Sequence, residues 1–350
     1  MRGAPVEGGV TMRLRHLRAA LRGWGGVGAM AAVCALALAC ALLLPLTQRG
    51  PDGRAAAGGS SRVAVGTQAR ADSCTAPEKQ TLAPSAADGP TIARIRAKGK
   101  LVVGVDQNSY RWGYRDPNKK GAQLEGFDID LVHAIARDVL GDPDAVQFKA
   151  IPTNQRVPAI QNGVVDMVVR TMTITCKRLK DVAFSAPYFR TGQQVLAPKD
   201  SPVTGYDTSL AGKRICTAAG STAYTTLEDD KKSGRLPASA DISTTVPNQL
   251  DCLVRLQLGE VDAVVTDGAL AASQAAQDPT VELKGRAFTT EYYGVAMKKD
   301  ADDLVRRVNH ILVGYSASGW QRSYGDWLSA TLGADSATSR PPAPQYLRTS

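Results

Sequence analysis

Two segments far apart in this chain follow the same plan, and this repeat constrains the fold more than any other feature. In each, a Gly closes a helical stretch and a Val-Asp pair leads into an apolar run: QNGVVDMVVRT (161–171) and QLGEVDAVVTD (257–267). A short apolar run bounded by turn residues is typical of a buried strand. The repeat therefore predicts two α/β units, with Asp166 and Asp262 interpreted as turn residues.

The chain from residue 90 onward alternates between the same two patterns. Apolar residues at helical spacing predict helices at 91–99, 126–141, 155–163, 247–259, 268–277, 303–320 and 324–333. Apolar runs predict strands at 100–106, 145–151, 165–171, 213–220, 260–267 and 292–299. Open α/β sheets bind ligands beyond the carboxyl ends of their strands, so two such edges facing each other predict a cleft between two lobes.

The N-terminal residues have a different character. Several Arg between residues 13 and 22 precede an uncharged stretch at 23–47, which is long enough to span a membrane. Basic residues before an apolar run keep that end of the chain in the cytoplasm. We expect a cytoplasmic basic segment at 1–22, a transmembrane anchor or signal segment at 23–47 and a flexible tether at 48–90. An uncleaved anchor is favoured, while a lipidated Cys40 and simple secretion remain open.

Charge and residue counts exclude two classes of function. Most of the net charge of +9 is N-terminal, because residues 1–62 carry eight Arg against one Glu and one Asp. The remainder is too thinly spread to indicate nucleic-acid binding. The three His are far apart and no CxxC pair occurs, so we expect no metal site and no cofactor. Four Cys lie outside the apolar stretch, an even number that suggests disulfides in an exported domain.

Several segments occur in the order, and near the spacing, of a known family. They are KLVVGVD, LEGFDIDLVHAIA, VPAIQNGVVDMVVRTMTITCKR, VAFSAPYF, GKRICTAAGST and GEVDAVVTDGAL. The chain resembles the family 3 solute-binding proteins, which are the amino-acid receptors of polar amino-acid ABC importers. DCLVRLQLGEVDAVVTD, AAQDP and EYYGVAMKK resemble most closely the actinobacterial glutamate/glutamine-binding branch of that family.

The resemblance implies an α/β, two-lobed periplasmic-binding-protein-like fold of type II, with a hinge of two crossing strands. The crossings are expected near GQQVLAP (192–198) and TTEYYGVAM (289–297). Lobe 1 would comprise residues 91–194 and 293–333, lobe 2 residues 195–292, and a loose tail residues 334–350.

The same resemblance assigns groups that bind the two charges of an amino acid. Arg178 matches the family's carboxylate-binding Arg, and its guanidinium fork suits a carboxylate. Thr171 and Thr173 lie on the same turn. The remaining candidates come from lobe 2: Gly220, Ser221 and Thr222, which open a helix whose N–H groups favour an anion, and Asp267, which matches the family's ammonium-binding Asp.

Side-chain selectivity is predicted from a narrower match. TNQR (153–156) resembles a segment of Gram-negative glutamate/aspartate receptors, so Thr153 and Arg156 are candidates for binding a distal carboxylate. Arg170 is a second basic residue beside this turn, with an interlobe or surface salt bridge as its alternative role. Those receptors carry a basic residue where this chain has Asp106, which leaves glutamine and asparagine open.

The disulfide pairing is implied by the resemblance and by lobe membership, since connectivity cannot be deduced from sequence alone. Cys216 and Cys252 are both expected in lobe 2 and are predicted to pair. Cys74 is then expected to pair with Cys176, which would tie the tether to the turn that carries Arg178.

These features predict a substrate-binding component, not an enzyme. It would capture a free polar amino acid at the outer face of the cytoplasmic membrane, with glutamate favoured and glutamine, aspartate and asparagine as the other candidates. The expected partners are an ABC permease with a separate ATPase subunit and the membrane through the N-terminal segment; we expect a monomer and no nucleic acid. Alternatives are an enzyme on the same fold, of the cyclohexadienyl dehydratase type, and a ligand-sensing module that acts through a partner.

Overall fold

The computed structural model describes residues 74–336 and 338–349. The predicted segments 1–22 and 23–47, Cys40 and most of the tether lie outside the described residues. Within the described residues, every helix is too short or too polar to cross a membrane.

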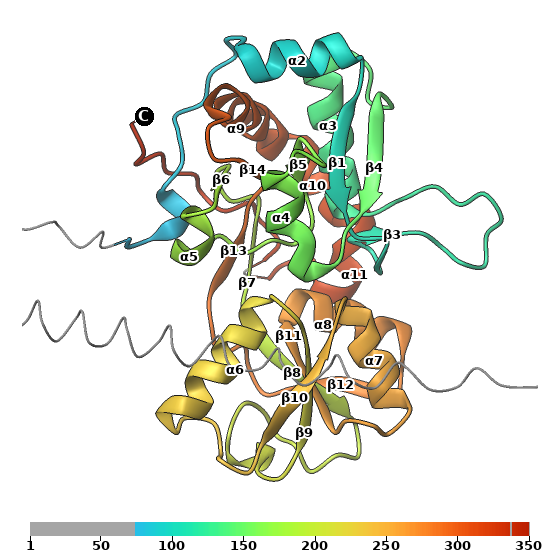
Figure 1. Cartoon of the computed structure of the whole chain (residues 1–350). Helices are drawn as coiled ribbons and strands as arrows, with labels where there is room; N and C mark the ends of the chain where they lie inside the picture. Colours follow the sequence, from blue (N-terminus) through green and yellow to red (C-terminus); the bar gives the residue numbers. More distant parts are fainter. Residues whose placement is uncertain (1–73, 337, 350) are drawn as a thin grey trace, which may run out of the picture. The chain divides into compact units, whose positions relative to one another are not determined.

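The first sheet has five strands in the order β4-β1-β5-β14-β6 (Figure 1). β1 runs parallel to β4 and β5, while β14 returns antiparallel between β5 and β6. The strands are β1 (Leu101–Val105), β4 (Val146–Ala150), β5 (Met167–Val168), β6 (Val182–Phe184) and β14 (Ala296–Lys298). Its helices are α2 (Pro90–Lys98), α3 (Phe127–Leu140), α4 (Arg156–Gln161), α5 (Cys176–Leu179) and α9 (Asp302–Ala317). We call this sheet and its helices lobe 1.

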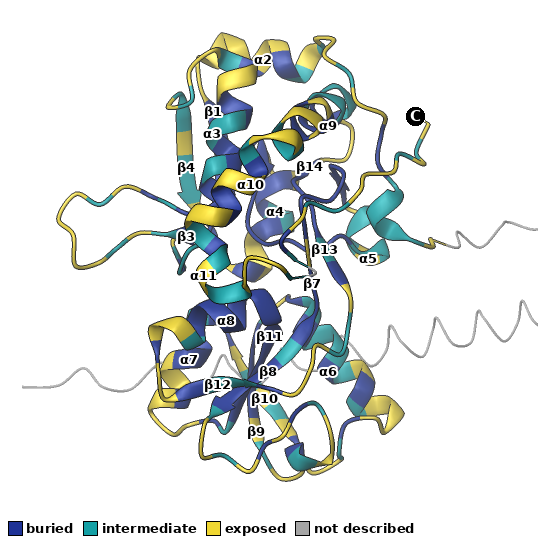
Figure 2. Ribbon diagram, turned by 180° about the vertical axis from the view of Figure 1, so that it is seen from behind, coloured by how far each residue is buried: buried dark blue, intermediate teal, exposed yellow. Residues whose placement is uncertain are grey.

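The second sheet also has five strands, in the order β10-β9-β11-β8-β12. β9 lies parallel to β10 and β11, while β8 runs antiparallel to β11 and β12. The strands are β8 (Gln193–Pro198), β9 (Arg214–Ala218), β10 (Asp241–Val246), β11 (Ala263–Asp267) and β12 (Val281–Lys284). Its helices are α6 (Thr222–Ser233), α7 (Gln249–Gln257) and α8 (Gly268–Gln277). We call this unit lobe 2; Figure 2 shows central strands such as β1 and β11 buried between helices with exposed outer faces.

Smaller elements complete the fold. A short hairpin, β2 (Asn108–Ser109) with β3 (Gly113–Tyr114), follows β1. After α9 come α10 (Gly319–Ser323), the π-helical turn η5 (Tyr324–Leu328) and α11 (Ser329–Leu332), where one helix at 324–333 was predicted. The 3-10 turns are η2 (Pro77–Lys79), η3 (Thr153–Gln155) and η4 (Thr208–Leu210).

Two strands cross between the lobes and pair with each other: β7 (Phe189–Thr191) and β13 (Glu291–Tyr293) (Figure 1). The second crossing lies within its predicted range. The first crossing, β7, ends directly before the expected segment 192–198, which consists of Gly192 and strand β8 of lobe 2. Gly192 marks the change from crossing strand to β8, since a Cβ there would lie 2.0 Å from the Thr289 carbonyl oxygen. Only glycine allows this close backbone approach.

The Asp of each repeated Val-Asp pair has a structural role. Asp166 Oδ2 accepts the N–H of Val102 in β1 at 3.0 Å. Asp262 Oδ2 accepts the N–H of Arg214 in β9 at 2.8 Å. Each carboxylate thus joins the start of its own strand to the start of the neighbouring parallel strand, which confirms their interpretation as turn residues.

The predictions of a tether reaching residue 90 and of a loose C-terminal tail are both wrong. Leu82 is fully buried in the lobe 1 core and forms a parallel bridge with Arg348. The Leu347 N–H donates to the Lys79 carbonyl at 2.9 Å, and the Arg348 guanidinium pairs with Asp302 of α9 at 2.8 Å. Burial of Leu82, backbone pairing between the two segments and an ion pair therefore help to fix two segments whose composition indicates flexibility.

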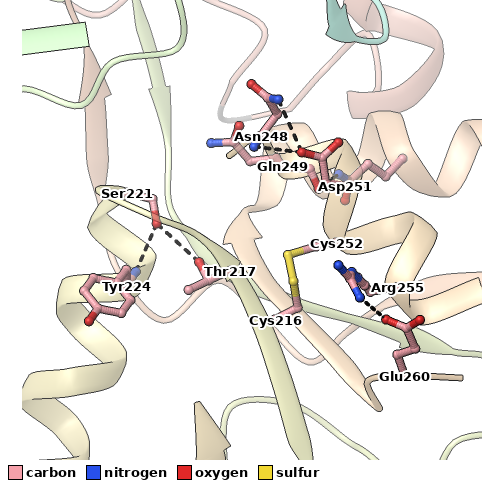
Figure 3. Close-up of a disulfide and its surroundings, with 11 residues drawn as sticks. Cys216, Thr217, Ser221, Tyr224, Asn248, Gln249, Asp251, Cys252, Arg255 and Glu260 are labelled. Atoms are coloured by element: carbon pink, nitrogen blue, oxygen red, sulfur yellow. Dashed lines mark hydrogen bonds and ion pairs between the residues drawn. A yellow bond between two sulfur atoms is a disulfide. The ribbon is translucent and has the colours of Figure 1, made fainter. Parts of the chain in front are cut away.

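Both predicted disulfides are present. Cys216 of β9 joins Cys252 of α7 with a Cα–Cα separation of 5.6 Å (Figure 3). Cys74 joins Cys176 at the start of α5 with a Cα–Cα separation of 5.7 Å. For a loop as long as the one between Cys216 and Cys252, the chain-entropy model gives about 3–4 kcal/mol of stabilisation. The second bond holds the N-terminal segment against the short helix that carries Arg178.

Candidate functional site

The predicted site residues converge where the strand ends of the two lobes meet the crossing strands. The turn after β5 and helix α5 contribute from lobe 1, and the N-terminus of α6 and the end of β11 contribute from lobe 2. The predicted residues at this junction are Thr153, Arg156, Arg170, Thr171, Thr173, Arg178, Gly220, Ser221, Thr222 and Asp267.

Arg178 spans the two lobes. Its Nη1 donates to the carbonyl of Thr173 at 2.7 Å and its Nη2 to the carbonyl of Gly220, in lobe 2, at 3.0 Å. The N-cap Thr175 fixes the start of α5 by accepting the Arg178 N–H at 3.2 Å. Burial lowers the pKa of Arg178, an effect opposed by the negative charges of Glu291 and Asp267. Arg178 is therefore a half-buried cation at the interlobe junction.

The turn after β5 is strained. Thr171 has a φ of 41°, in the left-handed region that costs energy for a residue with a branched side chain. Its N–H donates to Asp128 Oδ2 at 3.0 Å, and the Tyr188 hydroxyl donates to Oδ1 at 2.8 Å. Burial raises the pKa of Asp128 to about 7. These bonds hold the turn that leads to Thr173, whose hydroxyl donates to Glu291 of the crossing strand β13 at 2.6 Å.

The N-terminus of α6 approaches lobe 1 closely. Gly220 has a φ of 75°, and a Cβ there would lie 3.0 Å from the Cα of Asn154. Ser221 is the N-cap, and its hydroxyl accepts the Tyr224 N–H at 3.0 Å (Figure 3). The Ser221 side chain is therefore used within α6, which leaves Thr222 as the side chain of this segment that faces the crossing strands.

Two carboxylates meet around one amide at the crossing strands. Gln193 Nε2 donates to Asp267 Oδ1 at 3.0 Å and to Glu291 Oε1 at 2.7 Å. The Tyr293 hydroxyl donates to the other oxygen of Asp267. Burial and the charge of Glu291 raise the pKa of Asp267 to about 8, although Tyr293, Arg156 and Arg178 oppose this shift.

Sequence reasoning missed Gln193, Glu291 and Tyr293 as site residues. All three lie within the two segments that were expected to cross between the lobes. Crossing segments border the interlobe cleft, so polar side chains in them were the available signal.

Arg170 is neutralised within the protein. Its guanidinium is fully buried and pairs with Asp106 Oδ2 at 2.8 Å. It also donates to Thr153 Oγ1 at 3.0 Å and to Asn248 Oδ1, in lobe 2, at 3.1 Å. Asp106, the acidic residue after the first strand, therefore pairs with Arg170, and its position in the sequence did not indicate this partner. The salt bridge of Arg170 lies within lobe 1 and is buried, so it is neither the interlobe nor the surface salt bridge considered as its alternative role; only its hydrogen bond to Asn248 crosses between the lobes.

Thr153 joins the lobes through its backbone as well. Its N–H donates to the carbonyl of Pro247 at 3.0 Å, and its hydroxyl donates to Gln249 Oε1 at 3.3 Å. This backbone bond is a reporter of lobe contact because its donor and acceptor lie in different lobes.

Arg156 is buried beside the same turn. Its guanidinium donates to the backbone carbonyls of Thr153, Arg170 and Thr171 at 2.9, 3.1 and 3.4 Å. Across the described part of the chain, no carboxylate lies within ion-pair distance of it. Burial and the charges of Arg178 and Arg170 lower its pKa well below the usual value. Arg156 is thus a cation that a further negative charge nearby would stabilise.

Comparisons with known proteins show which family and fold the chain resembles. Residues 101–330 match the model of the bacterial extracellular solute-binding proteins, family 3. The glutamine-binding protein GlnH of Bacillus subtilis is 33% identical over 68% of this chain and 84% of its own length. The glutamate-binding protein GluB of Corynebacterium efficiens is 29% identical over 68% of this chain and 80% of its own length.

A solved structure shares the fold. The solute receptor for L-cysteine of Neisseria gonorrhoeae aligns with a TM-score of 0.65 at 24% identity, over 73% of this chain and all of that one. The relatives named here are binding proteins, which confirms the prediction of a binding protein over an enzyme.

Proposed function

Because this chain belongs to the bacterial extracellular solute-binding proteins of family 3, we propose that it captures glutamate between its lobes and delivers it to an ABC permease. The permease and its ATPase would be separate subunits. The N-terminal segment would hold the chain at the outer face of the cytoplasmic membrane. The lobes would close on the ligand by rotation about β7 and β13.

The placement of opposite charges on the two sides of the junction carries this proposal. Arg178 of lobe 1 would bind the α-carboxylate with its guanidinium fork, supported by Thr173 and the N-terminus of α6. Asp267 of lobe 2 would bind the α-ammonium. A ligand held by both lobes favours their closure, because it shifts an equilibrium only through its different affinity for the two states.

The charge balance favours glutamate over glutamine. Arg170 already has Asp106 as its partner, and Arg178 is assigned to the α-carboxylate. Arg156 is the cation that remains without a carboxylate partner in the described residues, so a distal carboxylate would stabilise it. The names of the Bacillus subtilis and Corynebacterium efficiens relatives, glutamine-binding and glutamate-binding, support a side chain of this length.

Replacing Arg156 by Gln tests this choice of ligand. We expect Arg156→Gln to weaken glutamate binding by roughly tenfold or more, the effect of removing the partner of a buried charge, and to change glutamine binding much less. Calorimetric titration of the purified full chain with both amino acids measures the two losses.

Arg156→Lys is the matched control, because it keeps the charge but loses the fork that binds three carbonyls. It should retain the preference for glutamate even if it lowers thermal stability. Equal losses for glutamate and glutamine in Arg156→Gln would mean that Arg156 supports the turn and does not select the ligand.

A further inference from the structure

Glu291, on the crossing strand β13, accepts hydrogen bonds from both lobes. Its Oε2 accepts the hydroxyls of Thr173, in lobe 1, at 2.6 Å and of Thr222, in lobe 2, at 2.9 Å. Its Oε1 accepts Gln193 Nε2 at 2.7 Å. The side chain is only 7% exposed, so these three donors replace the water that a carboxylate would otherwise bind.

The two threonines are the side chains that flank the proposed position of the ligand's α-carboxylate. A hydroxyl has one proton to donate, so a threonine that donates to Glu291 cannot at the same time donate to a ligand. Among nearby anions, Glu291 also has the largest effect in raising the pKa of Arg178. The Glu291 carboxylate therefore uses the donors and the positive field that an α-carboxylate would use.

The contacts of Glu291 depend on lobe closure. Thr173 and Thr222 lie in different lobes, so rotation of one lobe away from the other removes at least one donor. A buried carboxylate that loses a donor becomes less stable unless water replaces it. The three bonds consequently favour the closed arrangement before any amino acid contributes.

We propose that the Glu291 carboxylate is an internal competitor of the ligand's α-carboxylate, holding the lobes together through Thr173 and Thr222 until an amino acid displaces it. This inference rests on the proposed function, because it needs the α-carboxylate to bind beside Arg178. It gives Glu291 a role opposite to that of an ammonium-binding residue such as Asp267. The roles differ in sign: removing a competitor tightens binding, whereas removing an ammonium partner weakens it.

The test replaces Glu291 by Gln in the full chain. We expect two effects of Glu291→Gln: faster hydrogen exchange at the Thr153 amide without added amino acid, and glutamate binding tighter by roughly five- to tenfold. The first effect reports opening, because the Thr153 N–H donates to Pro247 across the lobes. Mass-spectrometric exchange and calorimetric titration measure the two effects.

Two further variants complete the design. Glu260→Gln is the matched control, because Glu260 is exposed and pairs with Arg255 in lobe 2, far along the chain from β13. It should change neither quantity. Glu291→Asp keeps the charge, but its side chain is shorter by one methylene and cannot reach both threonines. If the lobes open in this variant as well, the contacts of Glu291 with both lobes hold them together, and its charge alone does not. Circular dichroism confirms that each variant folds.

The outcomes distinguish this inference from the proposed function. If the wild-type chain binds no amino acid, the proposed function fails, but the exchange at Thr153 still tests whether Glu291 holds the lobes together. Unchanged exchange in Glu291→Gln, or weaker glutamate binding in that variant, would overturn the proposal for Glu291.

Discussion

Arg178→Ala is expected to weaken amino-acid binding by about 30-fold to several thousand-fold, the range that corresponds to losing one partner of a desolvated charge pair. Its guanidinium lies at the interlobe junction and donates to carbonyls of Thr173 and Gly220. The same guanidinium group has the planar, forked geometry that binds a carboxylate through two hydrogen bonds, so its removal should remove the contact with the ligand's α-carboxylate. Calorimetric titration of the full chain with glutamate measures the loss.

Two variants separate binding from folding. Arg178→Lys keeps the positive charge but loses the fork, so we expect an intermediate loss of affinity. Arg255→Ala removes an exposed Arg whose ion pair with Glu260 lies in lobe 2, and it should leave affinity unchanged. Wild-type affinity in Arg178→Ala would show that another group binds the carboxylate.

The second large effect concerns Asp267. Asp267→Asn keeps the shape of the side chain and its bond from Gln193, but it removes the charge that would bind the ammonium. We expect a loss of affinity similar to that of Arg178→Ala, because the ligand's ammonium would be buried without a counter-charge. Titration of the variant with glutamate, beside a thermal melt to confirm folding, measures this effect.

The same residue gives the binding a predicted pH dependence. The pKa of Asp267 is raised to about 8, mainly by burial and then by Glu291, so its carboxyl is mostly protonated at pH 7. An ammonium requires the ionised form, so binding should release a proton and affinity should rise with pH up to about 8. Asp267→Asn should abolish the dependence in this range. An affinity that falls as pH rises from 6 to 8 would contradict the assignment.

Much of the fold follows from local sequence pattern. The helix closed by Gly141 and the strands β1 and β11 lie within their predicted ranges, and the helix closed by Gly99 begins one residue before its range, because apolar spacing and left-handed terminal glycines are local signals. The packing of the C-terminal tail against lobe 1 could not be predicted from local sequence pattern. It depends on Leu82 entering a core and on Arg348 meeting Asp302, which lies 46 residues earlier in the chain.

The site was predictable in part for a similar reason. The family resemblance assigned Arg178, Thr173 and Asp267 to the candidate site, and all three lie at or after strand ends at the carboxyl edges of the two sheets, where open α/β sheets bind ligands. The charge state of the site was not predictable, because it depends on pairing across the fold. Asp106 neutralises Arg170 over a separation of 64 residues, and Gln193 brings Asp267 and Glu291 together.

Calorimetric titration with blocked ligands tests whether the chain recognises both α-groups of a free amino acid. L-glutamate, N-acetyl-L-glutamate and the α-amide of glutamate are titrated separately into the full wild-type chain. We expect glutamate to bind and each blocked analogue to bind far more weakly, because one lacks the cation for Asp267 and the other the anion for Arg178. Binding of either analogue as tightly as glutamate would contradict this expectation.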